Sequence, residues 1–213
     1  MKLLAYVPLL TPRIKYIFNF IFRDILKTDI SFSSNLEEFK SSALPKISYA
    51  SNPVSDEIHF KNVDLLLGHK ITKTNFKTTA FGDTIVPFAV TGGALPFDVF
   101  AAAFYFVSRY EEYIHYVPDE DGNFPAELSL QSRLKLLQIP VIDAWALILK
   151  NLLLKRYPKL FFGAKKFAFI PLTCMFPGRP HARPLAQTAL RLIQNFKGMI
   201  GRAQPEDQES AEL

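Results

Sequence analysis

A dense polar block over residues 108–113 carries many of the side chains in this chain that could do chemistry. Arg109 is followed by Glu111 and Glu112, and the block ends an apolar run that begins at Val99. A guanidinium beside carboxylates makes strong, directional hydrogen bonds, either with a polar ligand or within the group itself. The block therefore marks a candidate site at the end of a buried element.

An acidic loop follows the block and adds further candidates. Asp119 and Asp121 flank a turn at Gly122, and Glu127 comes shortly afterwards. Alternating oxygen side chains suggest a calcium loop, but an EF-hand places glycine sixth and glutamate twelfth. Counted from Asp119, the glycine is fourth and the twelfth residue is Leu130. We interpret the segment as an Asp-Gly turn instead.

Two interpretations of these residues are open. The charged groups form either a structural network that fixes the acidic loop against the preceding helix, or a site that hydrogen-bonds a sugar or a neighbouring domain. The same two interpretations apply to Tyr105, Tyr110 and Tyr113, which would either stack on the rings of a bound sugar or pack in the core. The candidate binding residues are Arg109, Glu111, Glu112, Asp119, Asp121 and Glu127.

The spacing of metal-ligating residues argues against a metal site. The four histidines are scattered, and Cys174 is the one cysteine, so it has no partner for an internal disulfide. Glu111 and His115 are four residues apart and would share a helix face, but no third ligand accompanies them. We expect no metal or other cofactor in this chain.

Composition and charge indicate a globular protein with a mildly basic surface. Of 213 residues 49% are hydrophobic, and 25 Lys+Arg stand against 20 Asp+Glu. The basic residues are interspersed rather than clustered, which argues against nucleic-acid binding. No stretch reaches the roughly 18 apolar residues of a membrane span, and Pro8 interrupts the apolar N-terminus without a cleavage site. We expect a cytoplasmic protein of unknown oligomeric state.

The elements that must position the polar block alternate between strands and helices. Strands are predicted over 3–7, 30–33, 46–50, 56–60 and 166–170, with a hairpin over 76–90 that turns at Gly82-Asp83. Helices are predicted over 12–26 after Thr11, in a short segment after Asn35, over 99–113 after Asp98, in a short piece over 129–137, and over 140–157. Residues 99–107 are apolar on all faces, which is typical of a central helix.

This order predicts an α/β fold in which helices pack on a layered sheet. We expect one domain over residues 1–171 and a divergent, irregular tail over 172–213. The tail contains many prolines and glycines, one helical candidate over 185–196, and a polar end over 203–213 that we expect to be disordered.

Several sequence blocks, spread in order over residues 1–171, point together to a known domain. They are YVP at 6–8, LTPRIKY at 10–16, LPKISY at 44–49, ALPFD at 94–98, SRYEEY at 108–113, FPAE at 124–127 and IPVIDAW at 139–145. The set resembles the N-terminal domain that precedes the catalytic domain in a group of bacterial polysaccharide deacetylase family proteins.

The resemblance implies a non-catalytic accessory domain that docks on a deacetylase domain or a glycan. In such proteins the strand that matches 167–171 leads into a Thr-Tyr-Asp-(Ile/Val)-Asp segment, where the metal-dependent barrel begins. Here Leu172-Thr173-Cys174 follows instead. Zinc is therefore expected only in the missing domain, which makes the chain a truncated or split member. One hypothesis is that residues from 172 onward are translated out of frame or come from a fusion.

Two alternatives from other classes stay open. The first is a small stand-alone enzyme with a site around Arg109, Glu111, Glu112 and Glu127, which requires a deep pocket with convergent carboxylates. The second is a basic interaction module for nucleic acid or anionic lipid, which requires a continuous basic face. The docking interpretation requires an exposed apolar patch near 167–171.

Overall fold

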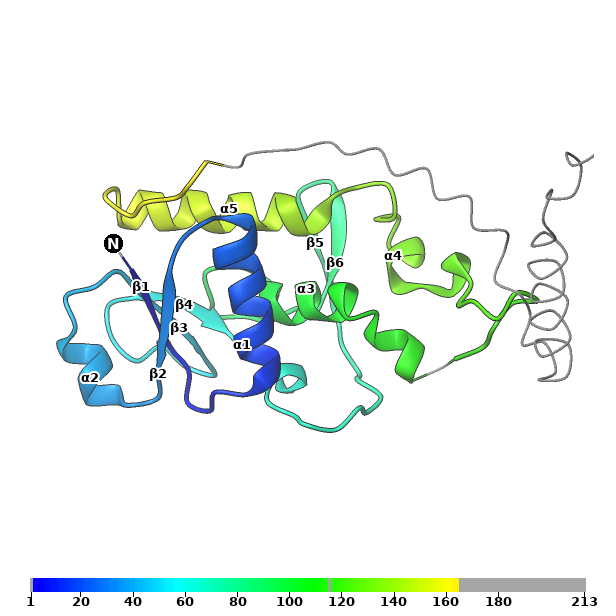
Figure 1. The fold of residues 1–213 in the computed structure, drawn as a ribbon, viewed down its shortest axis with the longest axis horizontal. Coiled ribbons are helices and arrows are strands. Elements are labelled where there is room, and N and C mark those ends of the chain that lie inside the picture. Colours follow the sequence, from blue (N-terminus) through cyan, green and yellow to red (C-terminus); the bar gives the residue numbers. More distant parts are fainter. Residues whose placement is uncertain (1, 115, 165–213) are drawn as a thin grey trace, which may run out of the picture. The chain divides into compact units, whose positions relative to one another are not determined.

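A four-stranded parallel sheet organises the N-terminal half of the chain (Figure 1). In this computed structural model, which describes residues 2–114 and 116–164, the strands are β1 (Leu3–Tyr6), β2 (Ile30–Ser33), β3 (Lys46–Ala50) and β4 (Ile58–Lys61). Their order is β2-β1-β3-β4, and every neighbouring pair is parallel. The predicted strands are confirmed, with β4 displaced slightly toward the C-terminus.

Helices cover both faces of this sheet. The helix α1 (Pro12–Phe18) continues as the π-helical η1 (Asn19–Ile25), and the short α2 (Leu36–Ser41) lies on the opposite face (Figure 1). Both begin at predicted caps: Thr11 Oγ1 accepts the Ile14 N–H at 3.2 Å, and Asn35 Oδ1 accepts the N–H groups of the first turn of α2. The structure is thus a mixed α/β fold, as the sequence predicts.

The central helix α3 (Val99–Val107) is shorter than predicted. Residues 99–106 are all buried, which confirms its central position. The expected continuation to Tyr113 is wrong, because Arg109 adopts the left-handed conformation at φ +49°, which cannot continue a right-handed helix. A separate 3-10 turn, η3 (Tyr110–Tyr113), follows and redirects the polar block.

The remaining elements frame α3. A 3-10 turn η2 (Asp64–Leu66) follows β4, and the predicted hairpin is present as β5 (Thr78–Phe81) and β6 (Thr84–Pro87). After the acidic loop come η4 (Ala126–Leu128), α4 (Leu130–Arg133) and the long α5 (Val141–Arg156). The helix α4 spans only the first part of the predicted 129–137 segment, whereas α5 agrees with prediction to within a residue or so at each end.

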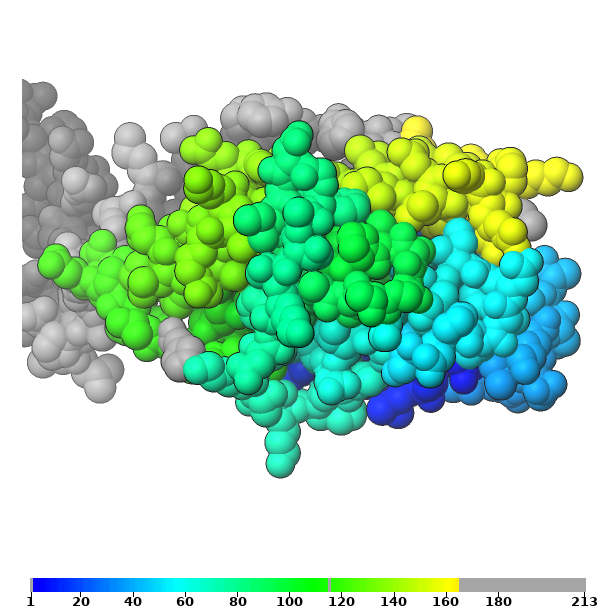
Figure 2. Space-filling view, turned by 180° about the vertical axis from the view of Figure 1, so that it is seen from behind, coloured from blue at the N-terminus to red at the C-terminus, as the bar shows by residue number. Residues whose placement is uncertain are grey.

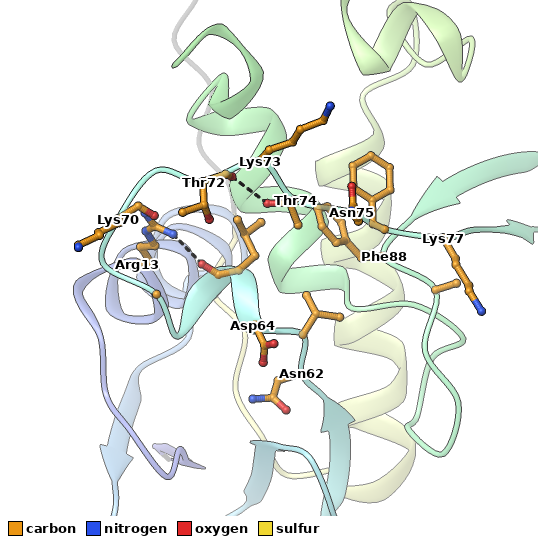
Figure 3. Close-up of a pocket in the computed structure, with 15 residues that line it drawn as sticks. Arg13, Asn62, Asp64, Lys70, Thr72, Lys73, Thr74, Asn75, Lys77 and Phe88 are labelled. Carbon is orange, nitrogen blue, oxygen red and sulfur yellow. Dashed lines mark hydrogen bonds between the residues drawn. The ribbon is translucent and has the colours of Figure 1, made fainter. Parts of the chain in front are cut away.

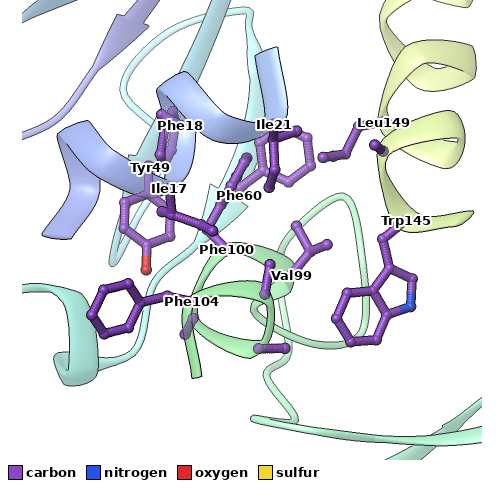
Figure 4. Close-up of a cluster of buried hydrophobic side chains, with 14 of the residues drawn as sticks. Ile17, Phe18, Ile21, Tyr49, Phe60, Val99, Phe100, Phe104, Trp145 and Leu149 are labelled. Atoms are coloured by element: carbon purple, nitrogen blue, oxygen red, sulfur yellow. The ribbon is translucent and has the colours of Figure 1, made fainter. Parts of the chain in front are cut away.

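Aromatic side chains join the helices and the sheet into one core (Figure 4). Phe100 of α3 stacks on Phe18 of α1 with ring centroids 4.0 Å apart, and Tyr49 of β3 meets Phe100 edge-on at 5.4 Å. Trp145 of α5 packs against Phe106 at 5.9 Å. Burying each such ring contributes roughly 2–3 kcal/mol, so this cluster fixes α3 relative to the sheet.

The buried Asp98 ties the start of α3 to the ends of two strands. Its Oδ1 caps the helix by accepting the N–H groups of Phe100 and Ala101. Its Oδ2 accepts the Tyr49 hydroxyl at 2.7 Å and the Val63 N–H at 2.8 Å. Burial raises the pKa of Asp98 to about 6, although its four donors oppose that rise. One carboxylate therefore sets the position of the helix that leads into the polar block.

Several predictions fall outside the described residues. The strand over 166–170, the helical candidate over 185–196, the polar end over 203–213, the domain boundary at 171 and the docking patch near 167–171 all lie there. Over residues 2–114 and 116–164, no helix has both the length and the apolar character of a membrane span.

Candidate functional site

A cleft of about 640 Å³ lies where the polar block meets the acidic loop and the segment before the hairpin. We call it the carboxylate cleft. Figure 2 shows the atoms of the hairpin and of the residues before it as a blue-green column next to the light-green atoms of residues after about 120. The polar residues of its lining are Lys73, Thr74, Asn75, Glu111, Glu127 and Arg133, and the apolar ones are Phe76, Tyr105, Ile114, Val117, Phe124 and Leu128.

Glu111 reaches this cleft because the chain turns at Arg109. Its Oε2 accepts the N–H of Leu130, the first residue of α4, at 2.8 Å. Burial raises the pKa of Glu111, and the Leu130 hydrogen bond and the charge of Arg133 partly offset that rise. Glu111 therefore anchors α4 with one oxygen and leaves the other for a ligand.

Tyr105 of α3 supplies an aromatic wall with a neutral hydroxyl. Its ring packs edge-on against Phe76 at 5.9 Å and Phe88 at 5.7 Å. Burial, and then the nearby charge of Glu111, raises the pKa of Tyr105 to about 12. The phenol consequently keeps its proton throughout the physiological pH range and can both donate and accept hydrogen bonds.

Exposed charges of both signs complete the lining. Glu127 lies in η4, and Arg133 ends α4, which Ser129 caps by accepting the Ser132 N–H at 3.1 Å. Sequence reasoning found Glu127 but missed Arg133. The sequence gives no local signal for Arg133, because its place in the cleft depends on how α4 packs against the polar block.

The structure separates the six residues that the sequence singled out. Glu111 and Glu127 line the carboxylate cleft, whereas Arg109 pairs with Glu112 outside its lining. The side chain of Arg109 is 66% exposed. The four-residue network expected around Arg109 is therefore divided, since Glu111 and Glu112 serve different partners.

Asp119 serves its own loop rather than the cleft. Its Oδ1 accepts the N–H groups of Asp121 at 3.0 Å and Asn123 at 2.8 Å, and Gly122 adopts φ +78°. These contacts confirm the Asp-Gly turn. Asp119 and Asp121 do not belong to the cleft lining.

Within the part of the chain that the structure describes, no three His, Cys, Asp or Glu side chains come together as a metal-binding group. His115, which lies four residues after Glu111 and was considered with it as a pair of metal ligands, is outside the described residues. The chemistry that this cleft offers is therefore hydrogen bonding and stacking from Glu111, Glu127, Arg133 and the aromatic residues.

The fold and the cleft define a mixed α/β domain with a polar cleft walled by aromatic residues. Residues 3–158 match the model of a family of unknown function, DUF7033, and the chain belongs to this family. Comparisons with curated proteins and with solved structures found no match to the chain. The geometry of the cleft therefore carries the argument on function.

Proposed function

We propose that this chain is a non-catalytic accessory domain of a polysaccharide deacetylase-like protein and that it binds a glycan in the carboxylate cleft. The observation that carries the proposal is the composition of the cleft, in which two carboxylates and a guanidinium stand beside three aromatic rings. Its volume of about 640 Å³ lies within the range of about 300–1,000 Å³ that is common for ligand sites.

The lining suits the two surfaces of a sugar. Hydroxyl groups donate to the carboxylates of Glu111 and Glu127 and accept from Arg133, and charge-assisted bonds of this kind are the stronger ones. The apolar C–H faces of the ring pack on Phe76 and Tyr105. A cleft with charged hydrogen-bonding groups but no aromatic wall, or with aromatic rings alone, would suit a sugar less well.

Two of the sequence blocks that resemble the deacetylase accessory domain contribute to the cleft. The SRYEEY block at 108–113 supplies Glu111, and the FPAE block at 124–127 supplies Phe124 and Glu127. The association with a deacetylase rests on these and the other blocks, while glycan binding rests on the geometry.

The test is a calorimetric titration of the full chain with an oligomer of N-acetylglucosamine. Arg133→Ala and Glu127→Gln are each expected to weaken binding roughly tenfold or more, because each removes a charged hydrogen-bonding partner worth about 1.5–3 kcal/mol. The matched controls are Arg109→Asn, which suits the left-handed backbone at that position, and Glu112→Gln. Both controls should bind like the wild type.

Absence of binding by the wild type at millimolar oligomer would refute glycan binding of this class. Equal losses of affinity in the cleft variants and in their controls would refute the assignment of glycan binding to the carboxylate cleft. Thermal unfolding of every variant distinguishes a lost contact from a lost fold.

A second candidate function rests on the raised pKa of Glu111, because a carboxyl group with a raised pKa in a cleft is typical of a general acid. Glu127 in the same cleft would supply the second carboxylate of a small hydrolytic enzyme. Chromatography of the titrated oligomer decides this point. Shortened or deacetylated products that disappear with Glu111→Gln would establish the enzyme and replace the binding-domain proposal.

A further inference from the structure

A second cleft, of about 570 Å³, lies beyond the carboxyl end of β4 (Figure 3). We call it the basic cleft. Four cationic residues, Arg13, Lys70, Lys73 and Lys77, line it, and the one carboxylate in its lining is Asp64. Figure 3 shows Lys70, Lys73 and Lys77 spread around the cleft with their ammonium groups directed outward, whereas Asp64 and Asn62 lie together below them. The cleft therefore has an excess of positive charge.

The Arg13 side chain is fixed in this cleft. Its Nη1 donates to the carbonyl of Leu65 at 2.7 Å and its Nη2 to the carbonyl of Lys70 at 2.9 Å. The guanidinium also lies over the rings of Phe104 and Tyr110, at 5.7 and 5.4 Å from their centroids. A guanidinium has five N–H donors, so donors remain for a ligand after these two bonds.

The positive charge of the cleft is not neutralised by ion pairs. In residues 2–114 and 116–164 the ion pairs are Arg109–Glu112 and Arg156–Asp56, and neither involves a residue of this cleft. The partners of Arg13 are neutral carbonyl groups and aromatic rings. A concave surface with unpaired charges of one sign concentrates its field and attracts a ligand of the opposite sign.

The two clefts share a wall. Residues Lys73, Thr74, Asn75 and Phe76 line both the basic cleft and the carboxylate cleft. A ligand in the carboxylate cleft that extends past this segment therefore reaches the basic cleft. A linear oligomer with a repeating unit is a ligand with that shape.

We propose that the basic cleft is an anion subsite for the same ligand, so that the glycan bound by this domain is an acidic oligosaccharide. This inference rests on the proposed function for the carboxylate cleft. The anionic group, a carboxylate or a phosphate on the chain of sugars, lies against Arg13 and draws Lys70 and Lys77 toward it from the rim. The neutral part of the oligomer occupies the cleft of Glu111, Glu127 and Arg133.

The test compares two probes of equal length on the full chain: a neutral oligomer of N-acetylglucosamine and an acidic oligomer in which N-acetylglucosamine alternates with glucuronic acid, so that neutral units remain for the carboxylate cleft. The acidic oligomer is expected to bind more tightly at low salt, and raising the salt should reduce this advantage. The double variant Lys70→Gln/Lys77→Gln should reduce binding of the acidic oligomer roughly five- to tenfold and leave the neutral oligomer unaffected. Lys155→Gln/Lys159→Gln, which changes two exposed lysines outside both clefts, is the matched control.

The outcomes separate the subsite from the proposed function. If both oligomers bind equally and the lysine variants change neither, the anion subsite is refuted while glycan binding stands. If the lysine variants weaken binding of the acidic oligomer but Arg133→Ala changes the affinity for neither oligomer, the anion subsite stands. Glycan binding in the carboxylate cleft is then refuted. Equally tight binding of oligodeoxythymidylate would replace the glycan with a nucleic acid and overturn the inference.

Discussion

Replacing Asp98 by alanine should be among the most damaging single substitutions in the described part of the chain. The carboxylate accepts four hydrogen bonds: two from the first turn of α3, one from the Val63 N–H and one from the Tyr49 hydroxyl. Loss of the helix cap costs about 1 kcal/mol. The fully buried Tyr49 hydroxyl is left without its acceptor, which costs about 1–3 kcal/mol, and the Val63 N–H adds a smaller cost.

The expected loss for Asp98→Ala is roughly 3–5 kcal/mol, a large part of the roughly 5–15 kcal/mol that stabilises a typical domain. Urea unfolding followed by tryptophan fluorescence measures it, because Trp145 is the one tryptophan and is buried against Phe106. The companion variant Tyr49→Phe removes a single donor and should cost only about 1 kcal/mol.

The double variant provides the sharper test. Once Asp98 is alanine, the Tyr49 hydroxyl has no acceptor, so adding Tyr49→Phe should recover stability rather than reduce it further. A loss below about 1.5 kcal/mol for Asp98→Ala, or an equal cost of Tyr49→Phe in both backgrounds, would refute this reasoning.

Two further predictions concern pH and the close approach of a loop to the sheet. Because burial raises the pKa of Asp98 from 3.8 to about 6, the part of its contribution to stability that depends on protonation is complete below pH 3.8 and is lost as the pH rises through about 6, whereas its hydrogen bonds persist at either pH. The stability of the wild type relative to Asp98→Asn should therefore fall by up to about 3 kcal/mol between pH 4 and 7 in urea unfolding, and a flat or rising difference would contradict this assignment. The pH dependence of stability that His59 adds has the opposite sign, because burial lowers its pKa and its contribution to stability is lost as the pH falls below 6.5. Both the wild type and Asp98→Asn contain His59, so this effect cancels in the comparison. Gly93→Ala should lower the melting temperature, because the new methyl group would lie 2.9 Å from the Lys61 backbone nitrogen, and an unchanged melting temperature would show that the loop moves away freely.

Local signals account for what could be predicted from the sequence. Thr11, Asn35 and Asp98 each cap the helix that the sequence places after them, because a cap depends on only a few neighbouring residues. Alternating apolar residues located the strands for the same reason. The end of α3 was not predictable in this way, because the left-handed conformation of Arg109 is imposed by surrounding structure on a residue type that rarely adopts it.

The clefts depend on contacts between residues far apart in the sequence. Glu111 and Glu127 were found because they flank one loop, whereas Arg133 enters through the folding of α4. The basic cleft was missed altogether, since its lysines follow no periodic pattern and the position of their segment depends on Arg13, more than fifty residues earlier. Counting charges along the chain revealed no basic cluster, but the fold creates one.

Chemical-shift mapping of the ¹⁵N-labelled full chain during titration with an N-acetylglucosamine oligomer would locate the glycan site residue by residue. If the glycan binds in the carboxylate cleft, we expect saturable shifts at the backbone amides of residues 73–76, Glu111, Leu128 and Arg133, with Arg109 and Asp119 unchanged. Shifts confined to other parts of the domain, or none at millimolar oligomer, would contradict glycan binding in this cleft.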